Sequence, residues 1–132
     1  MLFREIIKIG TNTDEFYDIT NRIRNIVEQC GIEEGSCHIF IPGTTAGIIL
    51  NENDRLLIED FRSFFEKVAA KDKVYSHPSN AQSHLKAFLA DCEKTLPISK
   101  GKLVLGNWQN IIIWEFDLTP RERDIIVTLT GD

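Results

Sequence analysis

Two threonines follow a proline–glycine pair in the stretch IPGTT, residues 41–45. Gly43 can adopt a positive φ at no steric cost, and Pro42 fixes the direction in which the chain enters the bend. Thr44 and Thr45 then bring two hydroxyls and backbone N–H groups to one bend, which can cradle an anion such as phosphate. The alternative is a tight β-turn whose threonines satisfy local backbone groups. The GxxxxGK[ST] spacing of a Walker loop is absent.

Two of the three histidines, His77 and His84, lie in the stretch HPSNAQSHLKA. Pro78 disfavours helical geometry at His77, so we expect His77 in the loop before a helix that carries His84. On one helix, seven residues would separate the pair by roughly 10 Å, whereas Zn–N distances are about 2.0–2.1 Å. A shared metal therefore requires the loop to fold back over the helix. The alternative is one histidine at the helix start and one partly buried polar histidine. His38, in the middle of a predicted strand, is expected to be structural.

Two further polar pairs lie at predicted strand ends. Asn51 and Glu52 place an amide beside a carboxylate, which can bind a metal or a substrate hydroxyl, or can simply be solvated surface. Trp108 can stack on a planar ring and Gln109 can hydrogen-bond the edge of that ring. A tryptophan at a strand start is, however, more often part of a core or an interface.

The charge of the chain limits its partners. The formal net charge is −5, which disfavours nonspecific binding to nucleic acid because such binding needs clustered lysine and arginine. Arg121 and Arg123 nevertheless lie close together in the last predicted connection. A planar guanidinium suits phosphate, unless both arginines are merely solvated in an exposed turn.

The cysteines and the N-terminal residues bear on the cellular location of the protein. Cys30, Cys37 and Cys92 form no CxxC pair and are odd in number, which predicts reduced, mostly buried thiols in a cytoplasmic protein. The first ten residues, MLFREIIKIG, carry charges within their apolar run, so we expect neither a signal peptide nor a membrane span. We therefore predict a protein that has no membrane partner.

The elements around these residues must position them. The predicted order is β-β-α-β-β-α-α-β-β-β-β. Strands are expected at residues 2–9, 15–19, 36–42, 46–50, 95–99, 101–106, 108–116 and 123–131. Because helices do not alternate one-to-one with strands, the order favours an α+β domain with mainly antiparallel sheets over a doubly wound parallel sheet. A length of 132 residues suits a single domain spanning residues 1–132.

Each of the three helices has a predicted cap and a predicted buried face. Thr20 and Asp54 are expected to cap the first two helices, and Gly31 to end the first. The third is expected to begin near Ser79 or Asn80, because Ser79 and Gln82 have the spacing of a capping box. Apolar residues at helical spacing form three faces: Ile23, Ile26, Val27 and Cys30; Leu57, Phe61, Phe64, Phe65 and Val68; and Leu85, Phe88, Leu89 and Cys92.

Read in order along the chain, these motifs resemble the YjbQ-like family, whose members are often described as secondary thiamine-phosphate synthases. The motifs are IPGTTAG from Ile41, Asn51-Glu52, HPSNAQSHLKA from His77, GKLVLGNWQ from Gly101, EFD from Glu115, and the run from Pro120 to Arg123. The resemblance implies a compact β-sandwich of mainly antiparallel strands with three helices. It also implies a homotrimer with a pocket near a subunit boundary. The implied activity joins an aminopyrimidine pyrophosphate to a thiazole phosphate and releases pyrophosphate.

The resemblance also assigns roles to the candidate residues. It implies that Glu52, His77 and His84 are catalytic and hold a divalent cation, Mg²⁺ or Zn²⁺, that neutralises the leaving group. No organic cofactor is expected. Binding of the phosphorylated substrates is implied for Thr44, Thr45, Asn51, Asn80, Trp108, Gln109, Arg121 and Arg123.

The sequence departs from the family pattern at three places. Gly43 stands where the family usually has histidine, Asn107 replaces the threonine of GTWQ, and the turn from Asp117 to Arg121 is one residue longer and lacks glycine. The retained threonines and histidines favour a trimeric enzyme. Gly43 favours a noncatalytic trimer that binds a small anion or a metal, or serves as an interaction module. A metal-dependent phosphate-ester hydrolase is the third hypothesis.

Overall fold

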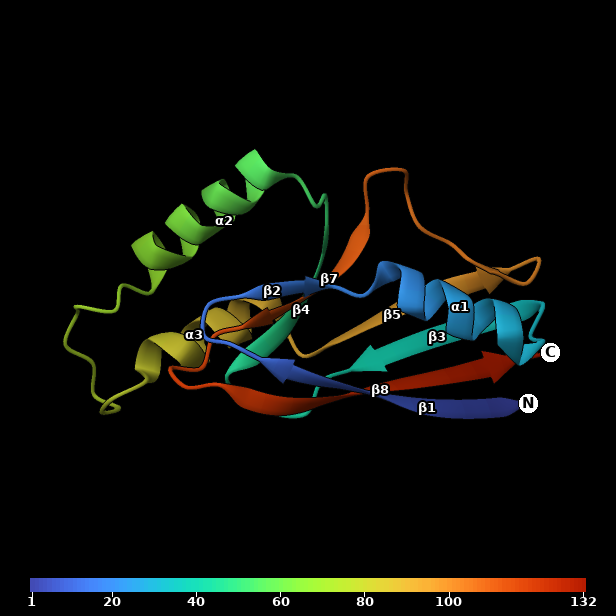
Figure 1. The fold of residues 1–132 in the computed structure, drawn as a ribbon, viewed down its shortest axis with the longest axis horizontal. Coiled ribbons are helices and arrows are strands. Elements are labelled where there is room, and N and C mark those ends of the chain that lie inside the picture. Colours follow the sequence, from blue (N-terminus) through green and yellow to red (C-terminus); the bar gives the residue numbers. More distant parts are fainter.

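The computed structural model describes residues 1–132 as eight strands and three helices (Figure 1). The helices are α1 Thr20–Cys30, α2 Arg55–Val68 and α3 Ala81–Ala90. The strands are β1 Leu2–Thr11, β2 Phe16–Asp18, β3 Glu34–Phe40, β4 Ala46–Asn51, β5 Glu93–Ser99, β6 Lys102–Leu103, β7 Asn110–Glu115 and β8 Arg121–Gly131. The predicted order of elements is confirmed. None of the helices is long and apolar enough to cross a membrane.

The strands form two sheets in which every pairing is antiparallel. The large sheet has the order β1-β8-β3-β5-β6, and the small sheet has the order β2-β7-β4. β1 pairs with β8 along its whole length, from Leu2 opposite Thr130 to Thr11 opposite Arg121. The α+β sandwich is therefore confirmed. The strand expected at 101–106 is shorter than predicted, because the chain after Leu103 leaves the sheet and turns at Gly106, whose carbonyl accepts the Gln109 N–H.

The main hydrophobic core lies between the large sheet and a layer formed by α1 and the inner face of the small sheet. β8 alternates buried and more exposed residues, so Ile125, Val127 and Leu129 all enter this core. α1 buries Ile23, Ile26 and Val27 as predicted, and it ends at Gly31 in the left-handed conformation. The prediction that Thr20 caps α1 was wrong, because Ile19 occupies the N-cap position. The Thr20 hydroxyl donates to Asp18 and accepts the Ile111 N–H, so this side chain ties α1 to β7 instead.

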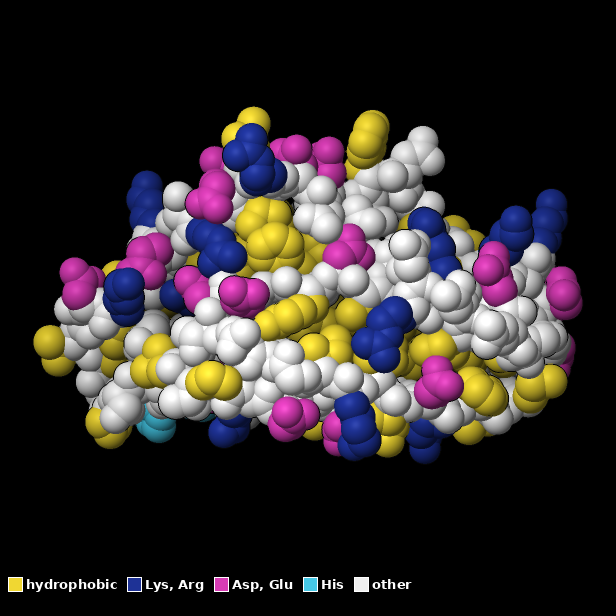
Figure 2. Space-filling view, in the orientation of Figure 1, with side chains coloured by type: hydrophobic (Ala, Val, Ile, Leu, Met, Phe, Trp, Pro, Cys, Tyr) yellow, Lys and Arg dark blue, Asp and Glu magenta, His cyan; other side chains and the backbone are white.

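A second core lies on the outer face of the small sheet, beneath α2 and α3. Phe65 of α2 packs edge to face against two rings of this core. Its ring centroid lies 5.3 Å from that of Trp114 in β7 and 5.0 Å from that of Phe116, which follows β7. Both faces of β7 are thus covered, which explains why all six residues from Ile111 to Phe116 are buried. Figure 2 shows hydrophobic side chains gathered below α2, between that helix and the strands.

Helix α2 has the predicted cap but a narrower buried face. The Asp54 carboxylate accepts the Leu57 N–H at 3.0 Å, as expected. Only Ile58 and Phe65 are fully buried, whereas Phe64 and Val68 of the predicted face are about half exposed. The helix leans on the small sheet along one line of side chains, so residues to either side of that line remain in solvent.

The predicted buried face of α3 was wrong. The helix buries small residues, including Ala87 and Ala90, while Phe88 is 79% exposed and Leu85 and Leu89 are more than 40% exposed. The reason is the close approach of α3 to β4, where a Cβ on Gly47 would lie 2.5 Å from the Ala90 Cβ. The expected capping box is also absent. Asn80 takes the N-cap position, but its side chain makes no capping hydrogen bond to the helix, and Gln82 is buried.

Candidate functional site

A pocket of about 420 Å³ lies between the threonine bend and helix α3. We call it the loop pocket. One wall is the chain that enters β4, and the other is α3 with the residues that follow it. It is lined by Gly43, Thr44, Ala46, His84, Ala87, Phe88, Asp91 and Cys92. Two of the expected site residues, Thr44 and His84, therefore face one cavity.

The two threonines of the bend have different environments. Thr44 is exposed at the loop pocket, whereas Thr45 is 4% exposed and points inward. The Thr45 hydroxyl donates to Asp117 Oδ2 at 2.9 Å and accepts from Arg123 Nη2 at 2.8 Å. The Thr45 carbonyl also accepts the Phe116 N–H. Thr45 thus anchors the bend to β8 and to the residues that follow β7, and only Thr44 has a hydroxyl free to meet a ligand.

Behind the bend lies a buried polar cluster, which we call the arginine network. Arg123 forms a two-point ion pair with Glu115: Nε donates to Oε1 at 2.7 Å, and Nη2 donates to Oε2 at 2.6 Å. The Thr11 hydroxyl donates to Glu115 Oε1 at 2.6 Å. Glu115 is fully buried and Arg123 is 5% exposed. A buried pair with this geometry fixes the positions of β1, β7 and β8 relative to one another.

The carboxylates of the arginine network are held in their charged form. Burial acts to raise the pKa of Glu115, but hydrogen bonds from Arg123, Thr11 and the Asp117 amide, with the Arg123 charge, hold this pKa below its ordinary value. Burial likewise acts to raise the pKa of Asp117. Hydrogen bonds from Thr119 and Thr45 and the charge of Arg121 outweigh it and lower the pKa. Neither carboxyl is therefore suited to act as a proton donor near neutral pH.

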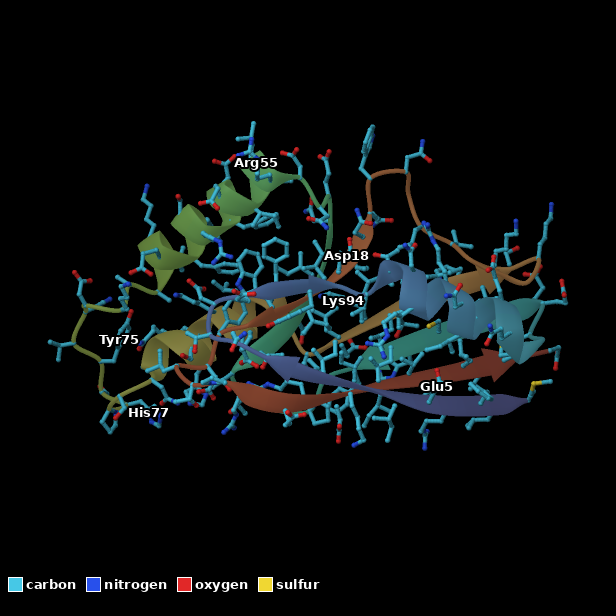
Figure 3. The ribbon with its side chains drawn as sticks, viewed as in Figure 1. Glu5, Asp18, Arg55, Tyr75, His77 and Lys94 are labelled. Atoms are coloured by element: carbon cyan, nitrogen blue, oxygen red, sulfur yellow. The ribbon has the colours of Figure 1, made fainter.

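His77 and His84 come together although they are seven residues apart. The loop before α3 folds back, and the two rings lie 5.0 Å apart between centroids, edge to face. His77 Nε2 is 3.1 Å from Asn80 Oδ1, so Asn80 positions His77. A second pocket of about 370 Å³ adjoins this pair, lined by Tyr75, Ser76, His77, Ala81, His84 and Leu85. His84 thus lines both pockets. Figure 3 shows His77 beside the start of α3.

Asn51 and Glu52 lie at the opposite end of the small sheet. Ala46 of β4 pairs with Glu115, while Asn51 pairs with Asn110. These two positions are five residues apart, or about 16 Å along the strand. Asn51 and the adjacent Glu52 therefore do not reach His84 within this chain. No three His, Cys, Asp or Glu side chains of the protein form a group that could hold a metal ion.

Trp108 and Gln109 immediately precede β7 and share that distant end. Trp108 is 72% exposed and contacts no pocket that contains His84. Gln109 Oε1 accepts the Gly106 N–H at 2.8 Å, which closes the turn before β7. The structure thus divides the expected site into two groups at the two ends of one small sheet.

Arg121 and His38 contribute little to the loop pocket. The Arg121 side chain is about half exposed and lies 3.4 Å from Asp117. His38 lies on the outer face of the large sheet, 3.0 Å from Glu93. His38 therefore does not replace the histidine that the family usually has at position 43.

Sequence reasoning gave no role to Glu115, Asp117 or Thr11. Glu115 did carry a signal, because it is one charged residue in the otherwise apolar run IIIWEF. A carboxylate in a buried strand requires a partner, and Arg123 lies on the buried face of β8, two residues before Ile125. Asp91 and Cys92 of the loop pocket were also missed as lining residues.

Two of the three cysteines, Cys37 and Cys92, lie in environments that disfavour the reactive thiolate. All three are free, and Cys37 is fully buried. Burial raises the pKa of Cys37 from 9.0 to about 12, with nearby Cys30 adding to the effect. Burial also raises the pKa of Cys92, and the adjacent Asp91 charge adds to it. Cys92 therefore lines the loop pocket as a thiol and not as a nucleophile.

We expect slow alkylation of Cys37 in the native protein. The thiolate population of Cys37 at neutral pH should be roughly a thousandfold below that of an ordinary cysteine, and its burial excludes the reagent. Mass spectrometry after iodoacetamide treatment should find Cys37 unmodified in buffer and modified in urea. Rapid labelling of Cys37 in the native protein would contradict this assignment.

The sequence comparisons give one consistent result. Residues 5–132 match the family model described as UPF0047 protein YjbQ-like. A UPF0047 protein of Archaeoglobus fulgidus is 40% identical over 116 residues, which cover 86% of this chain and 89% of that protein. A UPF0047 protein of Methanocaldococcus jannaschii is 37% identical over 134 residues, which cover 100% of this chain and 96% of that protein.

Solved structures show the same fold. A YbjQ-like protein of unknown function from Sulfolobus solfataricus has a TM-score of 0.90 and 35% identity, covering 100% of both chains. An uncharacterised conserved protein from Clostridium acetobutylicum has a TM-score of 0.86 and 37% identity, covering 97% of this chain and 99% of that chain.

Proposed function

This chain belongs to the YjbQ-like UPF0047 family, and we propose that it binds a small phosphorylated ligand in the loop pocket, with thiamine-phosphate synthase-type transfer as its reaction. The observation that carries the proposal is the meeting of Thr44 and His84 across one cavity of about 420 Å³. This volume lies in the range of about 300–1,000 Å³ that suits small-molecule sites. The acceptor and donor groups on the two walls suit a phosphate or a heterocycle.

Each residue at the pocket has a separate part in this proposal. Thr44 offers a hydroxyl and its backbone to the phosphate, while Thr45 holds the bend in place through Asp117 and Arg123. His84 offers a ring nitrogen that can donate to or accept from the ligand. The proposed reaction joins an aminopyrimidine pyrophosphate to a thiazole phosphate and releases pyrophosphate.

The enzyme proposal is tested by turnover of the two phosphorylated precursors. We expect His84→Ala to lower turnover by about tenfold or more, the equivalent of one lost hydrogen bond in the transition state. His38→Ala is the matched control, because His38 lies on the outer face of the large sheet. Equal turnover in wild type and His84→Ala would remove this residue from the mechanism.

The second candidate function is noncatalytic binding of a small anion or metal by an oligomeric protein. Gly43 favours it, because glycine supplies no proton-transfer group where the family usually has histidine. Calorimetry with each precursor, followed by a product assay, separates the two functions. Saturable binding without product supports the binding protein, and product formation excludes it.

The distance between the two groups of expected residues supports a shared site in a homotrimer. We place Glu52, Trp108 and Gln109 of one copy near the loop pocket of a neighbour, since they do not reach it within one chain. Glu52→Ala and His84→Ala should then be deficient separately, and refolding them as a mixture should restore part of the turnover. No recovery on mixing, or a monomer mass by light scattering, would overturn this arrangement.

The expected three-residue metal set does not form within one copy of this chain, because Glu52 is distant from the histidines. The two imidazoles alone do suit one ion. With Zn–N distances of about 2.0–2.1 Å, two ligating rings have centroids about 5 Å apart, and the observed separation is 5.0 Å. We propose that any divalent ion is held by these two rings, with the other positions filled by water or ligand.

We expect Zn²⁺ to raise the thermal midpoint of the wild type, because an ion that binds only the folded state stabilises it. The increase should be lost in His77→Ala and retained in His38→Ala. The measurement is differential scanning fluorimetry with and without Zn²⁺. Equal increases in the wild type and His77→Ala would rule out this pair as the binding site.

The cytoplasmic location that we propose rests on the cysteines. All three are unpaired, and Cys37 is buried in the main core. Free thiols without disulfides are typical of a reducing compartment. Recovery of the native protein from an extracellular fraction would contradict this location.

A further inference from the structure

The geometry points to the Arg123 guanidinium as the group that binds an oxyanion, phosphoryl or carboxyl, of the ligand beside Gly43. This inference rests on the proposed function for the choice of pocket and goes further by naming the donor atom. Arg123 donates through Nε and Nη2 to Glu115 and through Nη2 to Thr45. These bonds use three of its five N–H groups. Nη1 has no partner in the protein.

Nη1 lies next to Gly43, although Arg123 itself is not among the residues that line the loop pocket. A Cβ built on Gly43 would be 2.7 Å from Nη1, and Gly43 lines the pocket. The fully buried side-chain polar atoms without a partner are Ser83 Oγ and Trp114 Nε1. Nη1 is not one of them, so it retains access to the surface although Arg123 as a whole is 5% exposed. A side chain at position 43 would crowd this nitrogen, and glycine leaves the space beside it free.

The environment of Nη1 suits recognition of an oxygen acceptor. Three hydrogen bonds hold the guanidinium rigid, so the two N–H groups of Nη1 have a fixed direction before a ligand arrives. Preorganised donors of this kind lose little entropy on binding. Glu115 balances the Arg123 charge, and Asp117 is paired with Arg121 nearby. The site therefore recognises a ligand through the direction of its N–H donors, because the net positive charge nearby is small. This favours a single phosphoryl or carboxyl group over a dense polyanion.

The first experiment observes Nη1 directly in the wild-type protein. Protein carrying ¹⁵N in its arginine side chains is titrated with inorganic phosphate and, separately, with acetate. We expect a saturable change in the Arg123 Nη1 resonance, while Arg62, which is ion-paired with Asp14 at another surface, serves as the reference. A change with phosphate alone assigns a phosphoryl ligand, and a change with acetate extends the site to carboxylates. No saturable change with either anion overturns the inference.

The second experiment closes the space beside Gly43. Gly43→Ala should weaken phosphate binding by about 10- to 100-fold, the loss expected for one charge-assisted hydrogen bond. Gly31→Ala is the matched control, because Gly31 also has a positive φ but an added Cβ there meets nothing within 4 Å. Unchanged phosphate affinity in Gly43→Ala would contradict the inference. The wild-type titration decides the matter even if Gly43→Ala fails to fold.

The two proposals can fail separately. If phosphate or a precursor shifts the His84 ring resonances and leaves Arg123 Nη1 unchanged, the loop pocket binds the ligand and the Arg123 inference is wrong. If neither residue responds to phosphate or to either precursor, both the Arg123 inference and the proposed function are wrong.

Discussion

Replacing Arg123 by alanine is expected to lower the free energy of unfolding by about 3–5 kcal/mol, the usual cost of removing one partner of a buried ion pair. Glu115 would remain fully buried with a negative charge and lose two hydrogen bonds, of 2.6 and 2.7 Å. Thr45 would lose a donor at the same time. Urea denaturation of the variant and the wild type measures the change.

The nearby Arg121 supplies the matched control. Its side chain is about half exposed and lies 3.4 Å from Asp117, so Arg121→Ala should cost no more than about 1 kcal/mol. The double variant Arg123→Met with Glu115→Leu should recover part of the lost stability, because no charge is then left buried. Equal unfolding free energies for Arg123→Ala and Arg121→Ala would show that the arginine network does not stabilise the fold.

The same ion pair predicts a loss of stability in acid. The pKa of Glu115 is lower in the folded protein than its ordinary value of 4.5. Its contribution is therefore fully present above about pH 4.5 and is lost as the pH falls through the folded-state pKa. The wild-type unfolding free energy should decline in this window, and Glu115→Gln should flatten the decline. An identical acid dependence in both proteins would contradict the assignment.

Installing the histidine that the family usually carries at position 43 is expected to destabilise this chain. Gly43 has φ +130°, which side chains rarely adopt, and such backbone strain costs about 1–3 kcal/mol. The new Cβ would lie 2.7 Å from Arg123 Nη1, and overpacking of this kind adds about 1–3 kcal/mol. Gly43→His should therefore unfold at a clearly lower urea concentration and should not gain turnover.

The control for Gly43→His is Gly31→His. Gly31 has φ +83° in the left-handed region with open space around its Cβ position, so this variant carries only the backbone cost of that region. The difference between the two variants then reports the contact with Arg123 together with the greater backbone strain at φ +130°. Equal destabilisation of the two variants would show that Arg123 moves aside without cost. A more stable Gly43→His would show that the bend readily adopts the family conformation.

The sequence predicted most of the fold because its signals were local. Alternating residues marked the strands, Asp54 marked the start of α2, and Gly31 marked the end of α1. Helix α3 was placed correctly but oriented wrongly. Hydrophobicity assigned Phe88 to the core, whereas the space opposite Gly47 admits only residues as small as Ala90. The distance between α3 and β4 depends on their tertiary packing, which no local sequence pattern predicts.

The candidate site was less predictable because its contacts are distant in sequence. Thr11 and Glu115 are 104 residues apart, and Thr45 and Arg123 are 78 residues apart. The sequence therefore could not separate the inward Thr45 from the exposed Thr44. The sequence did indicate that His77 and His84 could meet only if the loop before α3 folds back over the helix, and the loop does so. Glu52 was grouped with the histidines because the sequence does not show that β4 runs away from the bend and places Glu52 at the far end of the small sheet.

The position of β8 between β1 and β3 in the large sheet has a consequence for biosynthesis. β8 leaves the ribosome after all the other strands, yet it pairs with both β1 and β3. Until it emerges, β1 has no strand to pair with, because β8 is its one neighbour in the sheet. Pairings between such distant segments form slowly, and unpaired strands are prone to aggregation. The nascent chain therefore cannot complete its large sheet until β8 has cleared the exit tunnel, and until then the β8-facing edge of β3 is exposed to aggregation.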